Sequence, residues 1–416
     1  NVGCIPTKAL VRAAEIAHLA RRGTEFGVEA DVRIDGPAVM RRIARVMEDG
    51  RRFYEDLVAK DDGVLLVTAR ASFSGKRLLL DGRDPGLNGV PTVLAVGAAP
   101  AMAPIPGAAS VPFLTSDTLL RLPDLPRSLG IVGGGPIAVE FAQAMRRLGV
   151  PVTLVMRGEA PLRGEEPEAR HVIARVLATE GVRVVVNATG ASLLQIADGI
   201  RVSWDGGHAD VAHVLLATGR EPAVAELRPE AAGIALETGG IAVDESLATT
   251  AAGYWAIGDA VGGEHRRFQF THAATYDGPR VAETILAGGT SRARYDAMPR
   301  VTFTDPEVAA VGLTEAAALA RDHDVHVHVK QIRDLGKARS VGETEGFVKV
   351  VLDRYTKKLL GATVVVAHGG DMLPALTIPL HVDGGRLDEV LATTFAHPTL
   401  AEGLKVAVRN GIGELA

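Results

Sequence analysis

Residues 131–140 read Ile-Val-Gly-Gly-Gly-Pro-Ile-Ala-Val-Glu. They follow a run that predicts a strand and open a run that predicts a helix, the setting that a G-x-G-x-x-A phosphate-binding turn requires. Gly133 permits the tight turn, and Gly135 lets a pyrophosphate approach the backbone. Ala138 takes the last position of the pattern, and the helix N-terminus supplies amide donors. The alternative is a glycine-rich turn that binds no ligand.

Strands and helices alternate around this turn. The predicted strands are 129–132, 152–156 and 182–186, and the predicted helices are 136–148 and 167–179. Such alternation is typical of a parallel sheet with helices on both faces. Two further runs, 200–204 and 211–217, predict hairpin-like strands that close this unit.

The rest of the chain is also of mixed type. Apolar residues recur at helical spacing in 6–22, and a second helix is predicted over 37–60. Short β-rich runs occupy 64–68, 77–80 and 92–96. A mixed region follows residue 239 and ends near residue 287, and a β-rich, then helical segment runs from residue 298 to the end.

Length and composition narrow the class of protein. The 416 residues make two to three domains at about 150 residues each. Hydrophobic residues at 47% and charged residues at 23% are ordinary for a globular protein. The net charge of −5 and the 4% of aromatic residues argue against a nucleic-acid partner. The longest uncharged stretch, 87–116, contains five prolines, so it predicts strand and loop rather than a membrane span.

Two arginines follow the predicted strand 152–156. Where an NAD-binding domain carries an acid for the ribose 2′-hydroxyl, this chain has Arg157, with Arg163 six residues further on. Guanidinium groups match a 2′-phosphate in charge and geometry, so the pair predicts NADPH rather than NADH. The alternative is that both arginines are solvated surface charges.

The only cysteine is Cys4, which lies just before the predicted helix 6–22 with Lys8 nearby. A helix N-terminus and a cation favour the thiolate form, so Cys4 is a candidate redox or nucleophilic group. An inert buried cysteine is the alternative. A lone cysteine forms no disulfide within this sequence, and it favours an intracellular, cytoplasmic location.

The segment 1–8, Asn-Val-Gly-Cys-Ile-Pro-Thr-Lys, resembles the redox-active segment of the FAD-dependent pyridine nucleotide-disulfide oxidoreductases. That family includes dihydrolipoamide dehydrogenase, glutathione reductase and mercuric reductase. The likeness continues in order through 95–97, 133–140, 217–220, 256–259, 299–307 and 397–402, so it spans the chain. Several ordered motifs together are far more specific than any one of them.

The resemblance implies an α/β fold with two Rossmann-like nucleotide-binding domains, for FAD and NADPH, and an α+β C-terminal dimerisation domain. The implied division is an FAD-binding domain in two parts, 1–115 and 239–297, an NAD(P)H-binding domain at 116–238 and a dimerisation domain at 298–416.

The resemblance also implies roles for individual residues. Cys4 matches the flavin-proximal cysteine of a redox disulfide, and Lys8 with Glu140 matches an ion pair beside the flavin. His397 and Glu402 match an acid–base pair that reaches the disulfide from the partner subunit, which implies a homodimer.

Other matching residues belong to cofactor motifs. Asp259 matches the acid that contacts FAD, although a turn acid is the bland alternative. The glycines of these motifs are Gly97, Gly219 and Gly258. No metal ligands are assigned. Val96 stands where a Thr is more usual, and Pro136 replaces an aromatic residue that often gates the nicotinamide pocket.

The cysteine that would pair with Cys4 falls two positions before Asn1 by this resemblance. The FAD-binding G-x-G-x-x-G would lie roughly 35–40 residues further upstream. Because the sequence also begins with Asn rather than Met, we expect it to be part of a longer chain.

The implied activity passes hydride from NADPH to FAD, then electrons to a disulfide containing Cys4, and finally to a small disulfide or metal substrate. Segments 12–19 and 402–405 look most similar to mercuric reductases. Those enzymes carry an adjacent cysteine pair near the C-terminus, which this sequence lacks, and a soft metal needs thiolate ligands. Dihydrolipoamide dehydrogenases usually take NAD, and no distinctive glutathione signature is present. A non-catalytic nucleotide-binding paralogue remains a further alternative.

Overall fold

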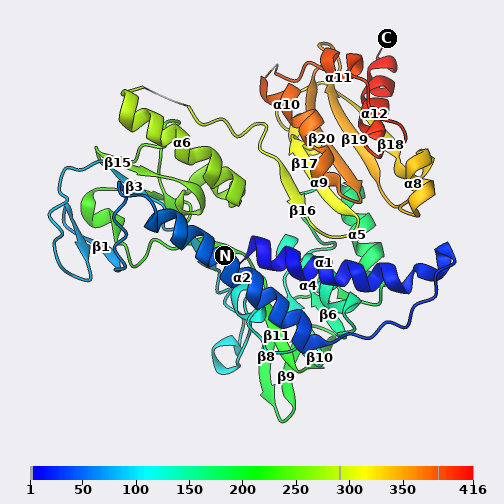
Figure 1. The fold of residues 1–416 in the computed structure, drawn as a ribbon, viewed down its shortest axis with the longest axis horizontal. Helices are drawn as coiled ribbons and strands as arrows, with labels where there is room; N and C mark the ends of the chain where they lie inside the picture. The colour runs from blue at the N-terminus through cyan, green and yellow to red at the C-terminus, as the bar shows by residue number, and fades with distance from the viewer. Residues whose placement is uncertain (1–2, 290–291, 383, 416) are drawn as a thin grey trace. The chain divides into compact units, whose positions relative to one another are not determined.

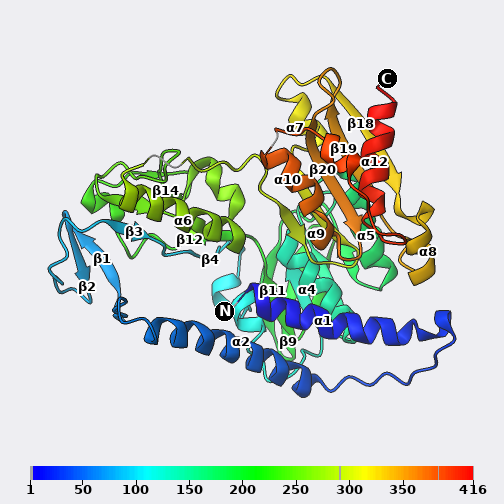
Figure 2. The same ribbon diagram turned by 45° about the horizontal axis from the view of Figure 1, so that its top comes forward.

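The computed structural model describes residues 3–289, 292–382 and 384–415 (Figures 1 and 2). It divides into two compact units. The first unit comprises Asn1–Met47, Ala103–Thr218 and Asp296–Ala416, and the second unit comprises Glu48–Met102 and Gly219–Tyr295.

The first unit contains the expected parallel sheet, with strand order β11-β5-β6-β7. Its strands are β5 (Leu129–Val132), β6 (Val152–Val155), β7 (Arg183–Val185) and β11 (His213–Leu216). The helices are α4 (Pro136–Arg147), which follows β5, and α5 (Pro167–Thr179), which follows β6. All four residues of β5 are buried, as expected for the central strand of such a sheet. The alternation expected from the sequence is confirmed.

The predicted hairpin between 200–204 and 211–217 is wrong. β9 (Gly199–Trp204) pairs instead with β8 (Ser192–Ile196) and β10 (Gly207–Val211), while β11 lies parallel to β5. The turn between β9 and β10 is Asp205-Gly206, with Gly206 at φ +90°, and Asp-Gly is a strong signal for a two-residue hairpin turn. The apolar run 211–217 therefore contains the end of one strand and the whole of another.

A second sheet of the first unit is antiparallel throughout, with order β16-β17-β20-β19-β18. We call it the C-terminal sheet. Its strands are β16 (Arg300–Thr302), β17 (Glu307–Gly312), β18 (Val325–Gln331), β19 (Phe347–Asp353) and β20 (Leu359–Val366). Helix α12 (Glu402–Gly413) shares a buried core with it through Leu404, Ala407 and Val408.

The first unit contains further α-helices in its described residues. They are α1 (Cys4–Arg21), α3 (Ser116–Leu119), α7 (Glu315–Leu319), α8 (Gly336–Val341), α9 (Gly369–Met372), α10 (Pro374–Val382) and α11 (Asp388–Ala392). Helix α2 (Gly36–Ala59) runs from the first unit into the second. The predicted helices 6–22 and 37–60 are confirmed within two residues at each end, as α1 and α2.

The second unit contains short strand pairs and one long helix. The pairs are β1 (Ala71–Ser74) with β2 (Arg77–Leu80), β3 (Thr92–Leu94) with β15 (Tyr254–Ala256), β4 (Ala98–Pro100) with β12 (Arg220–Pro222), and β13 (Leu236–Glu237) with β14 (Gly240–Ile241). The helix is α6 (Thr271–Ala287). The strand predicted at 64–68 is wrong, because Leu65 is 86% exposed and none of the described strands pairs with this segment.

No helix in the described part of the chain has both the length and the hydrophobicity that a membrane span requires.

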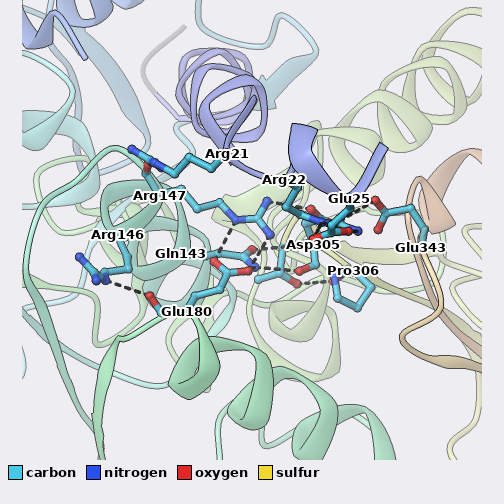
Figure 3. A network of polar contacts seen from close by, with 11 residues as sticks. Arg21, Arg22, Glu25, Gln143, Arg146, Arg147, Glu180, Asp305, Pro306 and Glu343 are labelled. Atoms are coloured by element: carbon cyan, nitrogen blue, oxygen red, sulfur yellow. Dashed lines mark hydrogen bonds and ion pairs between the residues drawn. The ribbon is translucent and has the colours of Figure 1, made fainter. Parts of the chain in front are cut away.

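A buried polar network joins α4 to the segment before β17 (Figure 3). Arg147 is 6% exposed, and its guanidinium donates to Glu180 at 2.6 and 2.9 Å and to Asp305 at 2.7 Å. Gln143 donates to the Asp305 carbonyl oxygen at 2.7 Å and accepts from its backbone N–H at 2.8 Å. Arg21 of α1 donates to the carbonyl oxygen of Arg147. One cation therefore balances two acids inside the unit.

We expect Arg147→Met to lower the free energy of unfolding by about 3–5 kcal/mol, because it leaves two partly buried carboxylates without their cation. Urea denaturation followed by circular dichroism measures this loss. The control is Arg175→Met, which breaks the exposed ion pair with Glu345 and should cost less than about 1 kcal/mol. Equal effects of the two substitutions would contradict a structural role for the network.

Candidate functional site

The glycine turn after β5 has the geometry of a phosphate cradle. Gly133 has φ +141°, and a Cβ there would lie 2.2 Å from the Ala217 carbonyl oxygen, so only glycine fits. Gly135 is the N-cap of α4 and has open space where a Cβ would stand. No side chain caps this helix, and Ala138 is fully buried in its first turn. The exposed helix N-terminus and open backbone fit a nucleotide pyrophosphate.

Both arginines predicted to select the nucleotide follow β6 and are exposed. The Leu162 N–H donates to the Gly134 carbonyl oxygen at 2.7 Å, which ties the loop carrying Arg163 to the glycine turn. Neither Arg157 nor Arg163 forms an ion pair or hydrogen bond with another described residue. Two unpaired guanidinium groups beside a phosphate cradle fit a further phosphate.

Cys4 is exposed at the start of α1, and Lys8 lies one turn further along the helix. The Lys8 Nζ lies 2.7 Å from Glu140 Oε2, and the Glu140 side chain is 6% exposed. The other carboxylate oxygen of Glu140 accepts from the Phe303 N–H at 2.9 Å. The ammonium group also lies 4.1 Å from the centroid of the Phe303 ring. Asn1 and Val2 of the motif lie outside the described residues.

Phe303 is therefore a residue whose role the sequence did not indicate. It holds Glu140 with its backbone and Lys8 with its ring, so it completes the pair that the sequence predicted. The signal was its place in the matched segment 299–307, but nothing local distinguishes it from a core aromatic residue.

His397 and Glu402 are also brought together. His397 Nδ1 lies 3.0 Å from Glu402 Oε1, and the His397 side chain is 79% exposed. The Thr399 N–H donates to Glu402 at 2.9 Å, and this bond, followed by the contact with His397, lowers the pKa of Glu402. An ionised carboxylate that engages Nδ1 orients the ring and leaves Nε2 for proton transfer.

The second unit holds the residues matched to the FAD motifs. β3 and β15 are parallel neighbours, and Gly97 and Gly258 follow their carboxyl ends, which is the edge where ligands bind such sheets. Burial raises the pKa of Asp259, whose carboxylate has its nearest charge at 3.9 Å, on Arg220. Gly97 has φ +68° and open space where a Cβ would stand. An acid that accepts no hydrogen bond from the described residues, next to an open backbone turn, fits a polyhydroxyl cofactor such as FAD.

Two further features of the second unit bear on this edge. Gly219 has φ +129°, and its carbonyl oxygen accepts from the Ala101 N–H at 2.9 Å, next to the β4–β12 pair. The Gly258 N–H donates to Asp277 at 2.9 Å, and the Tyr295 hydroxyl donates to the same carboxylate at 2.5 Å. Asp277 is 2% exposed. The sequence analysis missed Asp277, because a single acid inside a helix resembles a solvated surface charge.

A cavity of about 330 Å³ lies between α1, α4 and the C-terminal sheet. It is lined by Glu140 and Phe303, and by two acids, Glu307 and Glu343. Burial raises the pKa of both acids. Glu307 accepts a hydrogen bond from the Gly370 N–H at 2.8 Å.

Two family models match the chain. The model described as pyridine nucleotide-disulphide oxidoreductase matches residues 1–278, and the model of the dimerisation domain of these proteins matches residues 298–408. The chain belongs to the pyridine nucleotide-disulphide oxidoreductase family. Members use FAD and NAD(P)H, which confirms the expected fold class, enzyme class and cofactors. The dimerisation-domain match supports the expected homodimer.

Individual relatives agree with this assignment. A mercuric reductase of Bacillus cereus is 33% identical over 98% of this chain, which spans 65% of that enzyme, just under two thirds. A dihydrolipoyl dehydrogenase of Chlamydia trachomatis is 31% identical over 97% of this chain and 86% of its own length. The HOCl-induced flavoprotein disulfide reductase RclA from Escherichia coli, solved as a Cu(II) complex, is 28% identical with a TM-score of 0.85, covering 99% of this chain and 90% of its own.

We expect Glu307→Gln to stabilise the protein at neutral pH. A carboxyl whose pKa is raised by folding costs stability as pH rises from its unfolded pKa, near 4.5, through its folded pKa. The amide keeps an acceptor for the Gly370 N–H and has no charge to bury. The melting temperature of the variant should match the wild type near pH 4 and exceed it at pH 8.

The control for this substitution is Glu345→Gln. Its hydrogen bond to Arg175 lowers the pKa of Glu345, so this variant should lose stability relative to the wild type above pH 5 and match it in acid. The same pH trend in both variants would contradict the burial argument.

Proposed function

We propose that the protein is an FAD-dependent NADPH:disulfide oxidoreductase in which Cys4 belongs to the redox disulfide. The observation that carries the proposal is the bonding of Lys8, one turn after Cys4, to Glu140 of the nucleotide-binding helix α4. This contact joins the motif that carries the thiol to the motif that binds the nucleotide. The division of the chain into two FAD segments, an NADPH domain and a dimerisation domain is part of this proposal.

The overall reaction converts NADPH, a proton and a disulfide into NADP⁺ and two thiols. FAD, when bound, supplies the two-electron carrier between the nucleotide and the disulfide. Lys8, one turn after Cys4, is held by Glu140 at 2.7 Å. His397, oriented by Glu402, gives or takes the proton when a thiolate leaves or attacks.

Two classes of substrate are compatible with the proposed chemistry. A small disulfide fits the thiol–disulfide chemistry of Cys4, and a metal–thiolate substrate is a second candidate because the Bacillus relative is a mercuric reductase. A soft metal is bound by thiolate ligands, whereas a disulfide reacts directly by thiol–disulfide exchange. We therefore place the disulfide first. A cytoplasmic location, where reduced nucleotide is supplied, belongs to the same proposal.

Electron counting tests the proposed activity. In the FAD-loaded protein expressed from its complete gene, anaerobic NADPH titration should take up about four electrons per flavin, two for the flavin and two for the disulfide. Cys4→Ser should take up only two. A wild-type uptake of two electrons would leave Cys4 without a redox partner and overturn the disulfide-reductase assignment.

Nucleotide choice is tested by binding. We expect Arg157→Gln and Arg163→Gln each to weaken NADPH binding about tenfold to hundredfold, because each removes a charge-assisted contact worth about 1.5–3 kcal/mol. NADH has no 2′-phosphate, so its dissociation constant should change less than twofold. Fluorescence titration of both nucleotides measures the ratio, and equal weakening of both would contradict a 2′-phosphate role.

A further inference from the structure

The loop that carries the two arginines, residues 157–166, connects β6 to α5 and is held on one side by its own domain. The Leu162 N–H donates to the Gly134 carbonyl oxygen at 2.7 Å, and the Asn187 N–H donates to the Gly158 carbonyl oxygen at 2.9 Å. The first bond holds the middle of the loop at the glycine turn, and the second holds its start at the segment that follows β7. We call residues 157–166 the arginine loop.

The end of the arginine loop is held by the C-terminal sheet. Arg300 of β16 donates through Nε and Nη2 to the two oxygens of Glu165, both at 3.2 Å. Arg300 is 23% exposed and Glu165 is 13% exposed. A forked pair of this kind fixes orientation as well as distance. Glu165 lies two residues from Arg163, so its bonds to Arg300 hold the chain next to one of the two arginines.

A buried lysine holds the next residue. Lys349 of β19 is 2% exposed, and its Nζ lies 3.0 Å from Glu166, 2.9 Å from Glu168 and 2.8 Å from Glu315. Burial opposes the charge, but the three carboxylates outweigh it and raise the pKa of Lys349. Glu166 is the N-cap residue of α5, and its second oxygen accepts from the Glu315 N–H at 2.7 Å.

We propose that Arg300 and Lys349 are positioning residues for nucleotide selectivity, through which the C-terminal sheet fixes the arginine loop. The inference rests on the proposed function, in which Arg157 and Arg163 bind the 2′-phosphate. Buried charges of this kind specify one geometry more than they add stability. Without Arg300, the side chain of Glu165 loses its bonds to the C-terminal sheet, and the end of the loop that carries Arg163 is no longer held there.

The test compares NADPH and NADH binding to the FAD-loaded protein without turnover. Arg300→Gln and Lys349→Gln should each raise the dissociation constant for NADPH about fivefold to tenfold and leave that for NADH within twofold. Flavin content and circular dichroism establish that each variant is folded. If Lys349→Gln does not fold, Arg300→Gln decides the question, because Arg300 is partly exposed.

Two additional variants separate positioning from general damage. The double variant Glu165→Gln/Arg300→Gln should weaken NADPH binding no more than Arg300→Gln alone, because both substitutions remove the same tether between the loop and the C-terminal sheet. The matched control is Arg175→Gln, since Arg175 of α5 also bonds to the segment before β19, at Glu345, but lies outside the arginine loop. Its ratio of NADPH to NADH affinity should equal that of the wild type.

The outcomes distinguish this inference from the function on which it rests. If Arg157→Gln and Arg163→Gln do not change the nucleotide ratio, the proposed NADPH selectivity itself is overturned. If they change it but Arg300→Gln and Lys349→Gln do not, only the positioning role is overturned. Equal weakening of NADPH and NADH in the Arg300 variant would also overturn it, because that is the effect of a merely structural residue.

Discussion

The polar face of α4 is the constraint on which the rest of the first unit depends. Glu140, Gln143 and Arg147 are spaced three and four residues apart, so they share one face of the helix. All three bond to residues 303–305, which precede β17 of the C-terminal sheet. A helix that buries two charges and an amide must find fixed partners for them, because an unpaired buried charge is far more costly than a lost apolar contact. The position of the C-terminal sheet against the nucleotide-binding sheet follows from this requirement.

The same face connects structure to chemistry. Glu140 accepts from the Phe303 N–H with one carboxylate oxygen and from the Lys8 ammonium with the other. Phe303, which follows β16, therefore helps to fix the position of the Lys8 ammonium group. A displacement of α4 would therefore move the nucleotide cradle at Gly135 and the Lys8 charge together. One helix therefore connects the proposed nucleotide site at its N-terminus to the thiol motif packed along its side.

Much of this arrangement could be predicted from local pattern, and the remainder could not. The strand 129–132, the helix 167–179 and the glycine turn follow from periodicity and backbone restrictions that act within a few residues. The burial of Arg147 does not follow from local pattern, because the adjacent Arg146 has the same side chain. Arg147 is buried because its guanidinium pairs with the carboxylates of Glu180 and Asp305, which are distant in the sequence. The strand predicted at 64–68 failed for the same reason, since strand formation depends on a partner that local sequence does not reveal.

The position of the arginine loop depends on residues outside the loop. Arg157 and Arg163 are recognisable because they stand where a nucleotide-binding unit contacts the ribose, yet they are exposed and form no contact of their own with the described protein. Their placement comes from bonds at Gly134, Glu165 and Glu166, two of which end on the C-terminal sheet. A flexible cation pays ordering entropy when it binds a phosphate, and a loop held at both ends has less of that entropy to lose. Under the proposed function, nucleotide selectivity would depend on the packing between the two sheets as well as on the two guanidinium groups.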